Sequence, residues 1–260
     1  MTGKNCDGAF RPATVCFAME TITSRKNSYI RHLRRLAADG DYRRGCGEYV
    51  CDGDKLLAEA LRFARVTSIL WRETPGEAPC GAQYTAPAEL FEYASPLKSS
   101  GGPVFTVALP APGETPIRRA IVLEGVQDPG NVGAVIRTAN AFGVDAVVLT
   151  GECADLYHPR TVRATMGAIF RQNVLECAEL DAFLRDTGLP LYGAALSDRA
   201  RDIREVDLKN AAVAIGSEGR GLSQALLARC DGTIIIPMRP DSESLNAAAA
   251  AAVCLWEMAR

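Results

Sequence analysis

In the second half of the chain, short runs of apolar and β-branched residues alternate with segments of helical periodicity. The strand-like runs cover residues 120–124, 145–149, 190–195, 211–215 and 233–236. The helical segments cover residues 131–142, 160–168, 179–187, 222–229 and 244–258. Continuously apolar strands are typical of sheets buried on both faces, and parallel strands need crossover helices. The alternation therefore predicts an α/β fold with a mostly parallel sheet that helices cover on both faces.

The first part of the chain reads as a smaller α/β unit. Ser28 is a candidate N-cap of a helix whose apolar residues Ile30, Leu33 and Leu36 are spaced by three. Strand and helix signals then alternate over residues 48–51, 54–64, 66–71, 87–94 and 104–109. Three prolines and a glycine within residues 109–119 indicate a linker. We therefore divide the chain into residues 1–20 (an extension or a disordered segment), 21–110 (a first domain), 111–118 (the linker) and 119–260 (a second domain).

Charge and hydropathy exclude several classes of protein. The formal net charge is −2, so bulk charge alone does not make the chain a nucleic-acid binder. Residues 25–44 nevertheless carry seven positive and two negative side chains. No apolar run approaches the roughly 18 residues of a membrane span. Residues 1–20 lack the pattern of a signal peptide. We therefore expect a cytoplasmic protein that does not associate with a membrane.

The cysteines and histidines give no sign of a metal centre. Nine cysteines are scattered along the chain without a CxxC pair, and there are two histidines. A zinc site needs a closely spaced set of such ligands. Scattered thiols in a reducing compartment fit this pattern better, so we expect no metal.

The first informative segment follows the strand that ends at Glu124. A Gly/Pro turn leads into a helix that opens near Asn131, which is a plausible N-cap. Gly133 permits a close approach of the backbone, and Arg137 lies one turn further, near the same face. Taken alone, this segment is more typical of an ordinary strand–turn–helix with a surface arginine.

Two further strand ends carry similar signals. The strand over residues 211–215 runs into Gly216-Ser217-Glu218-Gly219-Arg220-Gly221, a backbone-lined loop suited to a nucleoside or a phosphate. Its glycine spacing matches neither the GxGxxG fingerprint nor a Walker loop. The strand that ends at Ile236 leads through a polar loop to a last helix, which Ser244 or Asn246 could cap and which should bury Leu255 and Trp256. In a parallel sheet such strand ends form the ligand site.

Together the three segments have one family's signature in one order. NVGAVIRT, IGSEGRGL and IPM followed by ESLN resemble the three motifs of the SpoU family of RNA ribose 2′-O-methyltransferases, in the SPOUT superfamily. The first part also matches: ITSRKNSYIRHLRRL and GEYVCDGDKLLAEAL resemble the small substrate-binding domain of the ribosomal-RNA members, itself similar to an RNA-binding ribosomal protein. Asp52-Gly53 stands where the family often has Glu-Gly, and Ala247-Ala248 where it often has Val-Ser.

The resemblance implies a deep trefoil knot in the second domain, S-adenosylmethionine as the cofactor, no metal, and a homodimer that completes the site. It implies cofactor contacts by Ala195, Leu196, Gly216, Ile236, Met238, Leu245 and Asn246. It implies catalytic roles for Arg137, Asn131, Glu218, Ser244 and Asn246, in which Glu218 could pair with Arg137. Arg137 would either orient the substrate phosphate or accept the 2′-hydroxyl proton, and we favour orientation because arginine keeps its charge. The RNA-binding residues would be Arg25, Lys26, Arg31, Arg34 and Arg35.

The leading hypothesis is S-adenosylmethionine-dependent 2′-O-methylation of RNA, with 23S (large-subunit) rRNA as the substrate. One alternative is the same reaction on tRNA, which the first domain disfavours. Another is a non-catalytic RNA-binding ribosome-assembly factor, which the intact Arg137, Glu218 and Asn246 disfavour. A nicotinamide-dependent Rossmann enzyme is disfavoured because GxGxxG is absent from the sequence.

Overall fold

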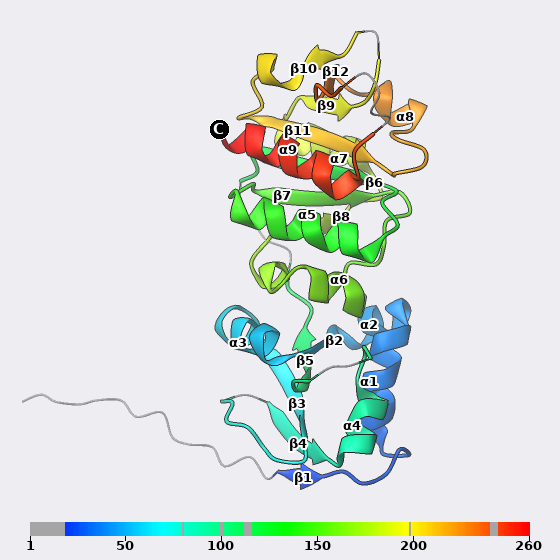
Figure 1. Cartoon of the computed structure of the whole chain (residues 1–260), viewed down its shortest axis with the longest axis vertical. Helices are drawn as coiled ribbons and strands as arrows, with labels where there is room; N and C mark the ends of the chain where they lie inside the picture. Colours follow the sequence, from blue (N-terminus) through cyan, green and yellow to red (C-terminus); the bar gives the residue numbers. More distant parts are fainter. Residues whose placement is uncertain (1–18, 80, 99–100, 112–115, 198, 240–243) are drawn as a thin grey trace, which may run out of the picture.

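The computed structural model describes residues 19–79, 81–98, 101–111, 116–197, 199–239 and 244–260. These residues form two sheets that follow one another along the long axis of the molecule (Figure 1). The first half of the chain builds the first sheet and the second half builds the second sheet. Each strand and helix predicted from the sequence is present, and the structure adds four strands and one helix that were not predicted.

Five described strands form the first sheet, in the order β1-β4-β3-β5-β2. They are β1 (Glu20–Thr21), β2 (Glu48–Asp52), β3 (Val66–Arg72), β4 (Ala82–Ala86) and β5 (Val104–Ala108). Its helices are α1 (Ser28–Ala38), α2 (Gly40–Cys46), α3 (Asp54–Phe63) and α4 (Ala88–Ala94). Helices α1 and α4 pack on one face, and α3 packs on the other. Asn27 caps α1 by accepting from the Tyr29 N–H, so the expectation that Ser28 is the cap was wrong.

The second sheet has seven described strands, in the order β10-β12-β9-β11-β6-β7-β8, and all neighbours run parallel. Its strands are β6 (Arg119–Glu124), β7 (Ala146–Thr150), β8 (Val174–Glu176), β9 (Leu191–Ala194), β10 (Arg201–Asp202), β11 (Ala211–Gly216) and β12 (Gly232–Ile235). Its helices are α5 (Pro129–Ala141), α6 (Pro159–Ala164), α7 (Leu180–Thr187), α8 (Gln224–Leu227) and α9 (Ala247–Ala259), with 3-10 turns η1 (Ala168–Phe170) and η2 (Ile203–Glu205). The predicted parallel α/β sheet is confirmed.

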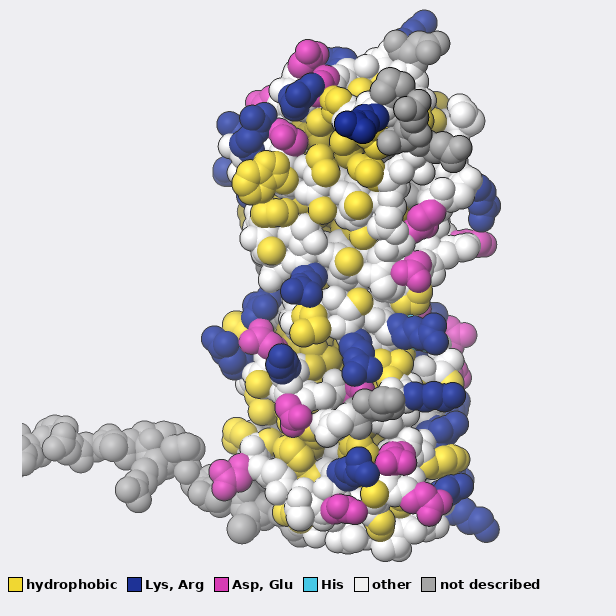
Figure 2. All heavy atoms as spheres, viewed as in Figure 1, with side chains coloured by type: hydrophobic (Ala, Val, Ile, Leu, Met, Phe, Trp, Pro, Cys, Tyr) yellow, Lys and Arg dark blue, Asp and Glu magenta, His cyan; other side chains and the backbone are white. Residues whose placement is uncertain are grey.

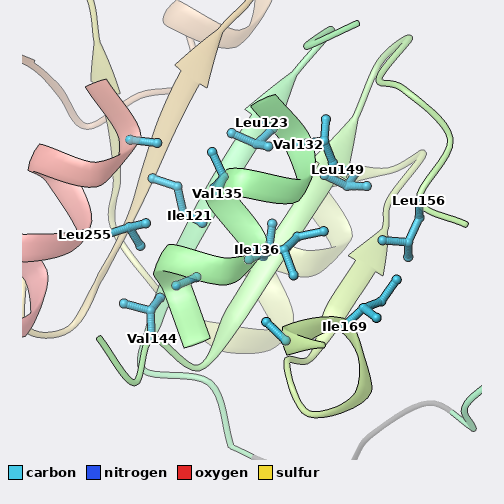
Figure 3. Close-up of a cluster of buried hydrophobic side chains, with 14 of the residues drawn as sticks. Ile121, Leu123, Val132, Val135, Ile136, Val144, Leu149, Leu156, Ile169 and Leu255 are labelled. Atoms are coloured by element: carbon cyan, nitrogen blue, oxygen red, sulfur yellow. The ribbon is translucent and has the colours of Figure 1, made fainter. Parts of the chain in front are cut away.

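Apolar side chains alternate between the two faces of this sheet. On one face, Ile121 and Leu123 pack against Val135 and Ile136 of α5 and against Leu255 of α9 (Figure 3). On the other face lies a second cluster, in which the side chains of β6, β7, β9 and β11 pack against α7 and α8. Because both faces are buried, the strands read as continuous apolar runs in the sequence.

The two halves of the molecule are joined by direct contacts. Arg43 of α2 donates to the Asp155 carboxylate at 2.8 Å, across the boundary between the halves. The rings of Tyr49 and Tyr157 lie 4.6 Å apart, and one buried cluster contains residues of both sheets. Arg171 also pairs with Glu59 of α3. None of the described helices is long and apolar enough to cross a membrane.

Candidate functional site

A pocket of about 400 Å³ opens at the carboxyl ends of β9, β11 and β12. A volume of this order holds a small organic ligand. Three segments far apart in the sequence contribute to its wall, and the predicted residues that line it are Ala195, Leu196, Gly216, Glu218, Ile236, Met238, Ser244 and Leu245. The structure therefore brings these predicted residues to one place, at the edge of the sheet where parallel sheets bind ligands.

The glycine loop doubles back at the end of β11. Ser217 and Gly221 form an isolated antiparallel bridge, and Gly221 has a φ of +65°, which favours glycine. A Cβ at Gly216 would overlap the backbone of Gly221 and Leu222. The sequence needs glycine at residue 216 so that the returning chain can pack on the strand end, and this places backbone N–H and C=O groups in the pocket wall.

A carboxylate of the neighbouring strand anchors this loop. Glu124 lies opposite Gly216 in the register of β6 and β11. Its carboxylate accepts hydrogen bonds from the Ser223 N–H and the Ser223 hydroxyl, both at 2.7 Å. The Ser223 Oγ in turn accepts from the Leu226 N–H and caps α8. The sequence analysis missed the roles of Glu124 and Ser223, although a carboxylate that ends an apolar strand was a visible signal.

Three side chains, one from each motif, form a hydrogen-bonded chain beside the pocket. Asp128 caps α5 by accepting from the Asn131 N–H, so the expectation that Asn131 is the N-cap was wrong. The side chain of Asn131 is thereby available for other partners: its Nδ2 donates to the Glu218 carboxylate, and its Oδ1 accepts from Asn246 at 3.2 Å. Asn246 Oδ1 also accepts from the Ala248 and Ala249 N–H groups and caps α9.

Arg137 lies apart from this chain. It follows Asn131 by six residues on α5, its side chain is exposed, and it does not line the pocket. Among the described residues, its guanidinium makes no hydrogen bond or ion pair. Within one subunit Glu218 accepts from Asn131 and does not pair with Arg137. Gly133, one turn earlier, does permit a close approach: a Cβ there would lie 2.6 Å from the Thr161 carbonyl oxygen of α6.

The five basic residues predicted to bind RNA are all exposed in or just before α1. Arg25 and Arg34 lie over the Tyr93 ring at 4.7 and 4.4 Å, and Arg35 lies over the Tyr42 ring at 3.8 Å. The same three guanidiniums also have polar partners: Arg25 pairs with Glu89, Arg34 donates to the Tyr93 carbonyl, and Arg35 pairs with Asp39. Lys26 and Arg31 are exposed and form no ion pair with the described residues.

Burial suppresses the reactivity of two of the described thiols, Cys230 and Cys254. Burial raises the pKa of the Cys254 thiol to about 12 and of Cys230 to about 11. These thiols are therefore protonated near neutral pH. In the described part of the chain, no group of three or more His, Cys, Asp or Glu side chains is arranged to hold a metal ion.

The all-parallel sheet thus carries a pocket built from a glycine turn and the loop before the last helix, and side chains of three motifs are hydrogen-bonded beside it. Residues 118–256 match the family model described as the SpoU rRNA Methylase family, and the chain belongs to this family.

Proteins of similar sequence cover nearly the whole chain. The 23S rRNA (guanosine(2553)-2′-O)-methyltransferase RlmP of Bacillus subtilis is 29% identical over 248 residues, which are 92% of this chain and 99% of that protein. An uncharacterized tRNA/rRNA methyltransferase of Synechocystis is 30% identical over 258 residues, which are 92% of this chain and 93% of that protein.

A solved structure has the same fold. The SpoU methyltransferase AviRb from Streptomyces viridochromogenes has a TM-score of 0.80 at 25% identity, over 90% of this chain and 97% of that chain. AviRb has also been solved in complex with the cofactor AdoMet. The similarity therefore extends over both sheets of the present structure.

Proposed function

We propose that this protein transfers a methyl group from S-adenosylmethionine to a ribose 2′-hydroxyl of large-subunit rRNA, and that it does so in the cytoplasm. The observation that carries the proposal is a pocket lined by the second and third motif segments, with Asn131 of the first motif hydrogen-bonded beside it to Glu218 and to Asn246. The family of the chain and the name of its Bacillus subtilis relative support RNA methylation and the choice of rRNA.

The lining of the pocket fits the cofactor. Ile236 and Leu245 supply apolar surface for the adenine, and the loop after Gly216 supplies backbone groups for its polar edge. Asn246 lies next to Leu245 and supports this wall through its cap on α9. When bound, S-adenosylmethionine supplies a methyl group already activated on a sulfonium, so the reaction needs no metal.

The polar side chains beside the pocket would position the ribose. A 2′-hydroxyl is protonated at neutral pH and must be aligned with the methyl group as its proton leaves. Asn131 and Asn246 hold each other and Glu218 in fixed orientations, and Ser244 lines the same wall. Arg137 stays charged and is suited to bind the neighbouring phosphate and orient the nucleotide.

We further propose a homodimer in which Arg137 acts in the site of the other subunit. Within its own subunit the guanidinium lies outside the pocket lining and is exposed. The surface over α9 is rich in hydrophobic side chains (Figure 2), and Trp256, 55% exposed, packs edge-on against Phe142. Exposed apolar surface of this kind is typical of an interface.

The remaining parts of the proposal concern the fold and the first half of the chain. We assign residues 21–110 to an RNA substrate-binding domain and residues 111–118 to its linker, on the resemblance of the first half and on its exposed basic helix α1. The trefoil knot in residues 119–260 is proposed on the resemblance of the three motifs. Residues 1–18 and 112–115 lie outside the described residues.

The reaction is tested by incubating the purified protein with cofactor labelled in the methyl group and with protein-free rRNA, rRNA in assembling particles, or tRNA. We expect label at one ribose of large-subunit rRNA, located by mapping the methylated nucleotide. Label on tRNA alone would reassign the substrate. Absence of transfer to every RNA would refute the enzymatic function.

The position of Arg137 is tested by mixing two variants that each lack one part of the site, at an S-adenosylmethionine concentration too low to load the Gly216→Ala pocket. Arg137→Ala retains an intact pocket, and Gly216→Ala has a damaged pocket but an intact Arg137. If Arg137 acts across the dimer, a mixture of the two recovers about one quarter of the wild-type activity, because half of the dimers have one complete site. If Arg137 acts in its own subunit, no mixed dimer has a complete site and the mixture stays inactive.

A further inference from the structure

A second cleft lies between the two halves of the molecule, outside the cofactor pocket. It has a volume of about 1040 Å³, and its walls come from the end of α1, the segment after α4, the start of α5, and α6. The charged groups that line it are Lys98, Arg160 and Arg163, together with His158, and no acidic residue lines it among the described residues. The protein as a whole has a net charge of −2, whereas the lining of this cleft is locally positive.

The cations of this cleft are free to bind a ligand. Lys98, Arg160 and Arg163 are exposed, and their side chains make no ion pair or hydrogen bond with the described residues. Several other exposed arginines of this protein do have partners: Arg25 pairs with Glu89, and Arg204 pairs with Asp202. Three unpaired cations around one cleft therefore form an anion-binding surface.

His158 adds a neutral donor to this surface. Burial and the nearby Arg43 and Arg160 guanidiniums lower the pKa of His158 and outweigh the opposite effect of the Asp155 carboxylate, so the ring is uncharged near neutral pH. Its Nδ1 accepts a hydrogen bond from the Arg160 N–H at 3.2 Å, which leaves the ring proton on Nε2. A neutral N–H donor beside three cations suits an oxygen of a phosphodiester.

The cleft connects the basic helix with the methyl-transfer site. Ala37 in its wall belongs to α1, the helix of Arg31, Arg34 and Arg35. Pro129 in the opposite wall opens α5, two residues before Asn131. Figure 2 shows lysine and arginine side chains along the waist between the two halves and further down the side of the first half. A strand bound to α1 would therefore reach Asn131 by crossing this cleft.

We propose that the cleft lined by Lys98, Arg160, Arg163 and His158 binds backbone phosphates of the substrate RNA between the first domain and the methyl-transfer site. The inference rests on the proposed function for the identity of the polymer and extends it by naming a binding site. The contacts are to phosphates and carry no base specificity, because each is a charge or a single donor.

The experiment measures the affinity for an in-vitro transcript of large-subunit rRNA as a function of salt concentration. The triple variant Lys98→Gln, Arg160→Gln, Arg163→Gln should bind more weakly and lose about 2 from the slope of log affinity against log salt, since each phosphate contact contributes about 0.7–0.9. The double variant Arg160→Lys, Arg163→Lys keeps the charges and should keep the slope. Calorimetry with S-adenosylmethionine should give the wild-type affinity for all variants.

A matched control removes three exposed cations elsewhere. Lys55 lies on α3, Arg185 on α7 and Lys209 before β11, and their change to glutamine alters the net charge equally. The proposal would be overturned if the slope of log affinity against log salt concentration were unchanged in the cleft variant, or if this control lost as much of that slope. Competition by millimolar inorganic phosphate at constant ionic strength would assign the cleft to a free anion and also overturn it.

The outcomes separate this inference from the proposed reaction. If the wild-type protein methylates no RNA but the RNA affinity of the cleft variant depends less on salt, the reaction is refuted and the phosphate site stands. If the wild-type protein methylates rRNA and the cleft variant binds and methylates with unchanged salt dependence, the reaction stands and the phosphate site is refuted.

Discussion

Asn246 donates a hydrogen bond of 3.2 Å to Asn131, a residue 115 positions earlier in the chain. This bond fixes the start of α9 against the start of α5. The Asn131 side chain in turn donates a hydrogen bond to Glu218 in the glycine loop. The same Asn246 side chain caps α9. One asparagine therefore stabilises a helix and aligns the side chains of the other two motifs.

These two roles of Asn246 can be separated by substitution. Asn246→Ser keeps an N-cap, because serine and asparagine are about equally good there, but the shorter side chain loses Asn131. We expect near-wild-type stability with at least about a tenfold loss in kcat, which corresponds to about 1.4 kcal/mol. Asn246→Ala should lose similar activity and about 1 kcal/mol of stability besides. Denaturant unfolding and methyl-transfer rates provide the two measurements, and full activity of Asn246→Ser would show that the contact with Asn131 is dispensable.

The glycine loop offers a matched pair of substitutions. A Cβ at Gly216 would overlap the returning backbone, whereas a Cβ at Gly219 meets nothing within 4 Å. Gly219 is also not one of the glycines with a positive φ, so its backbone conformation can accommodate alanine. We expect Gly216→Ala to weaken binding of S-adenosylmethionine by about tenfold or more, a change of about 1.4 kcal/mol. Gly219→Ala should leave calorimetric affinity unchanged. Equal affinities of the two variants for S-adenosylmethionine would show that the Gly216 turn is not part of the cofactor site.

Much of the fold could be predicted because the burial of a strand or of a helix face imposes a regular spacing of apolar residues on the sequence. All five strands expected in the second half are present, and Ile30, Leu33 and Leu36 are buried on α1 as their spacing indicated. Helix α2 was missed because its sequence is polar and its one buried residue is Arg43. Strands β8 and β10 were missed because three and two residues are too few to show a period.

The sequence motifs predicted which residues belong to the site, but they did not predict which of these residues are hydrogen-bonded to one another. Asp128 and Asn131 competed as N-cap residues, and Pro129 in the first turn of α5 favours Asp128. Once Asp128 is the cap, the Asn131 side chain is free to donate to Glu218, a contact that the sequence did not indicate. Leu255 is buried as expected, but Trp256 is exposed, contrary to expectation. Hydropathy alone does not distinguish an apolar residue that packs in the core from one that stays exposed on the surface.

The contact between Arg43 and Asp155 should hold the two halves together. The Arg43 side chain is 4% exposed and donates both to Asp155 and to the Leu36 carbonyl. Arg43→Met removes the donor to Asp155 Oδ2 and to the Leu36 carbonyl, while Asp155 Oδ1 still accepts from the Tyr157 N–H. We expect a loss of about 2 kcal/mol, below the value for a fully buried pair because Asp155 is partly exposed. Arg35→Met, which removes an exposed pair with Asp39 at 3.8 Å, should change stability by less than about 0.5 kcal/mol. Urea unfolding measures both, and equal effects would contradict a structural role of Arg43.

Acid should destabilise the first half of the molecule through Glu48. Hydrogen bonds from His32 and Thr67, at 2.9 and 2.6 Å, lower the pKa of the Glu48 carboxyl. Because the folded pKa lies below the unfolded value, Glu48 stabilises the fold above about pH 4.3, the value of an unperturbed glutamate. That contribution is lost as the pH falls through the folded pKa.

Glu48→Gln should therefore lower stability near neutral pH and flatten the decrease in urea midpoint below about pH 4.3. Glu92→Gln is the control, since Glu92 is exposed and pairs with Arg72 at the surface, and it should leave the acid profile unchanged. A Glu48→Gln profile parallel to that of the wild type would mean that the bonds from His32 and Thr67 do not favour the ionised carboxyl. The pH dependence would then have to come from other carboxyls, such as Asp202, whose pKa the Arg204 guanidinium lowers to about 2.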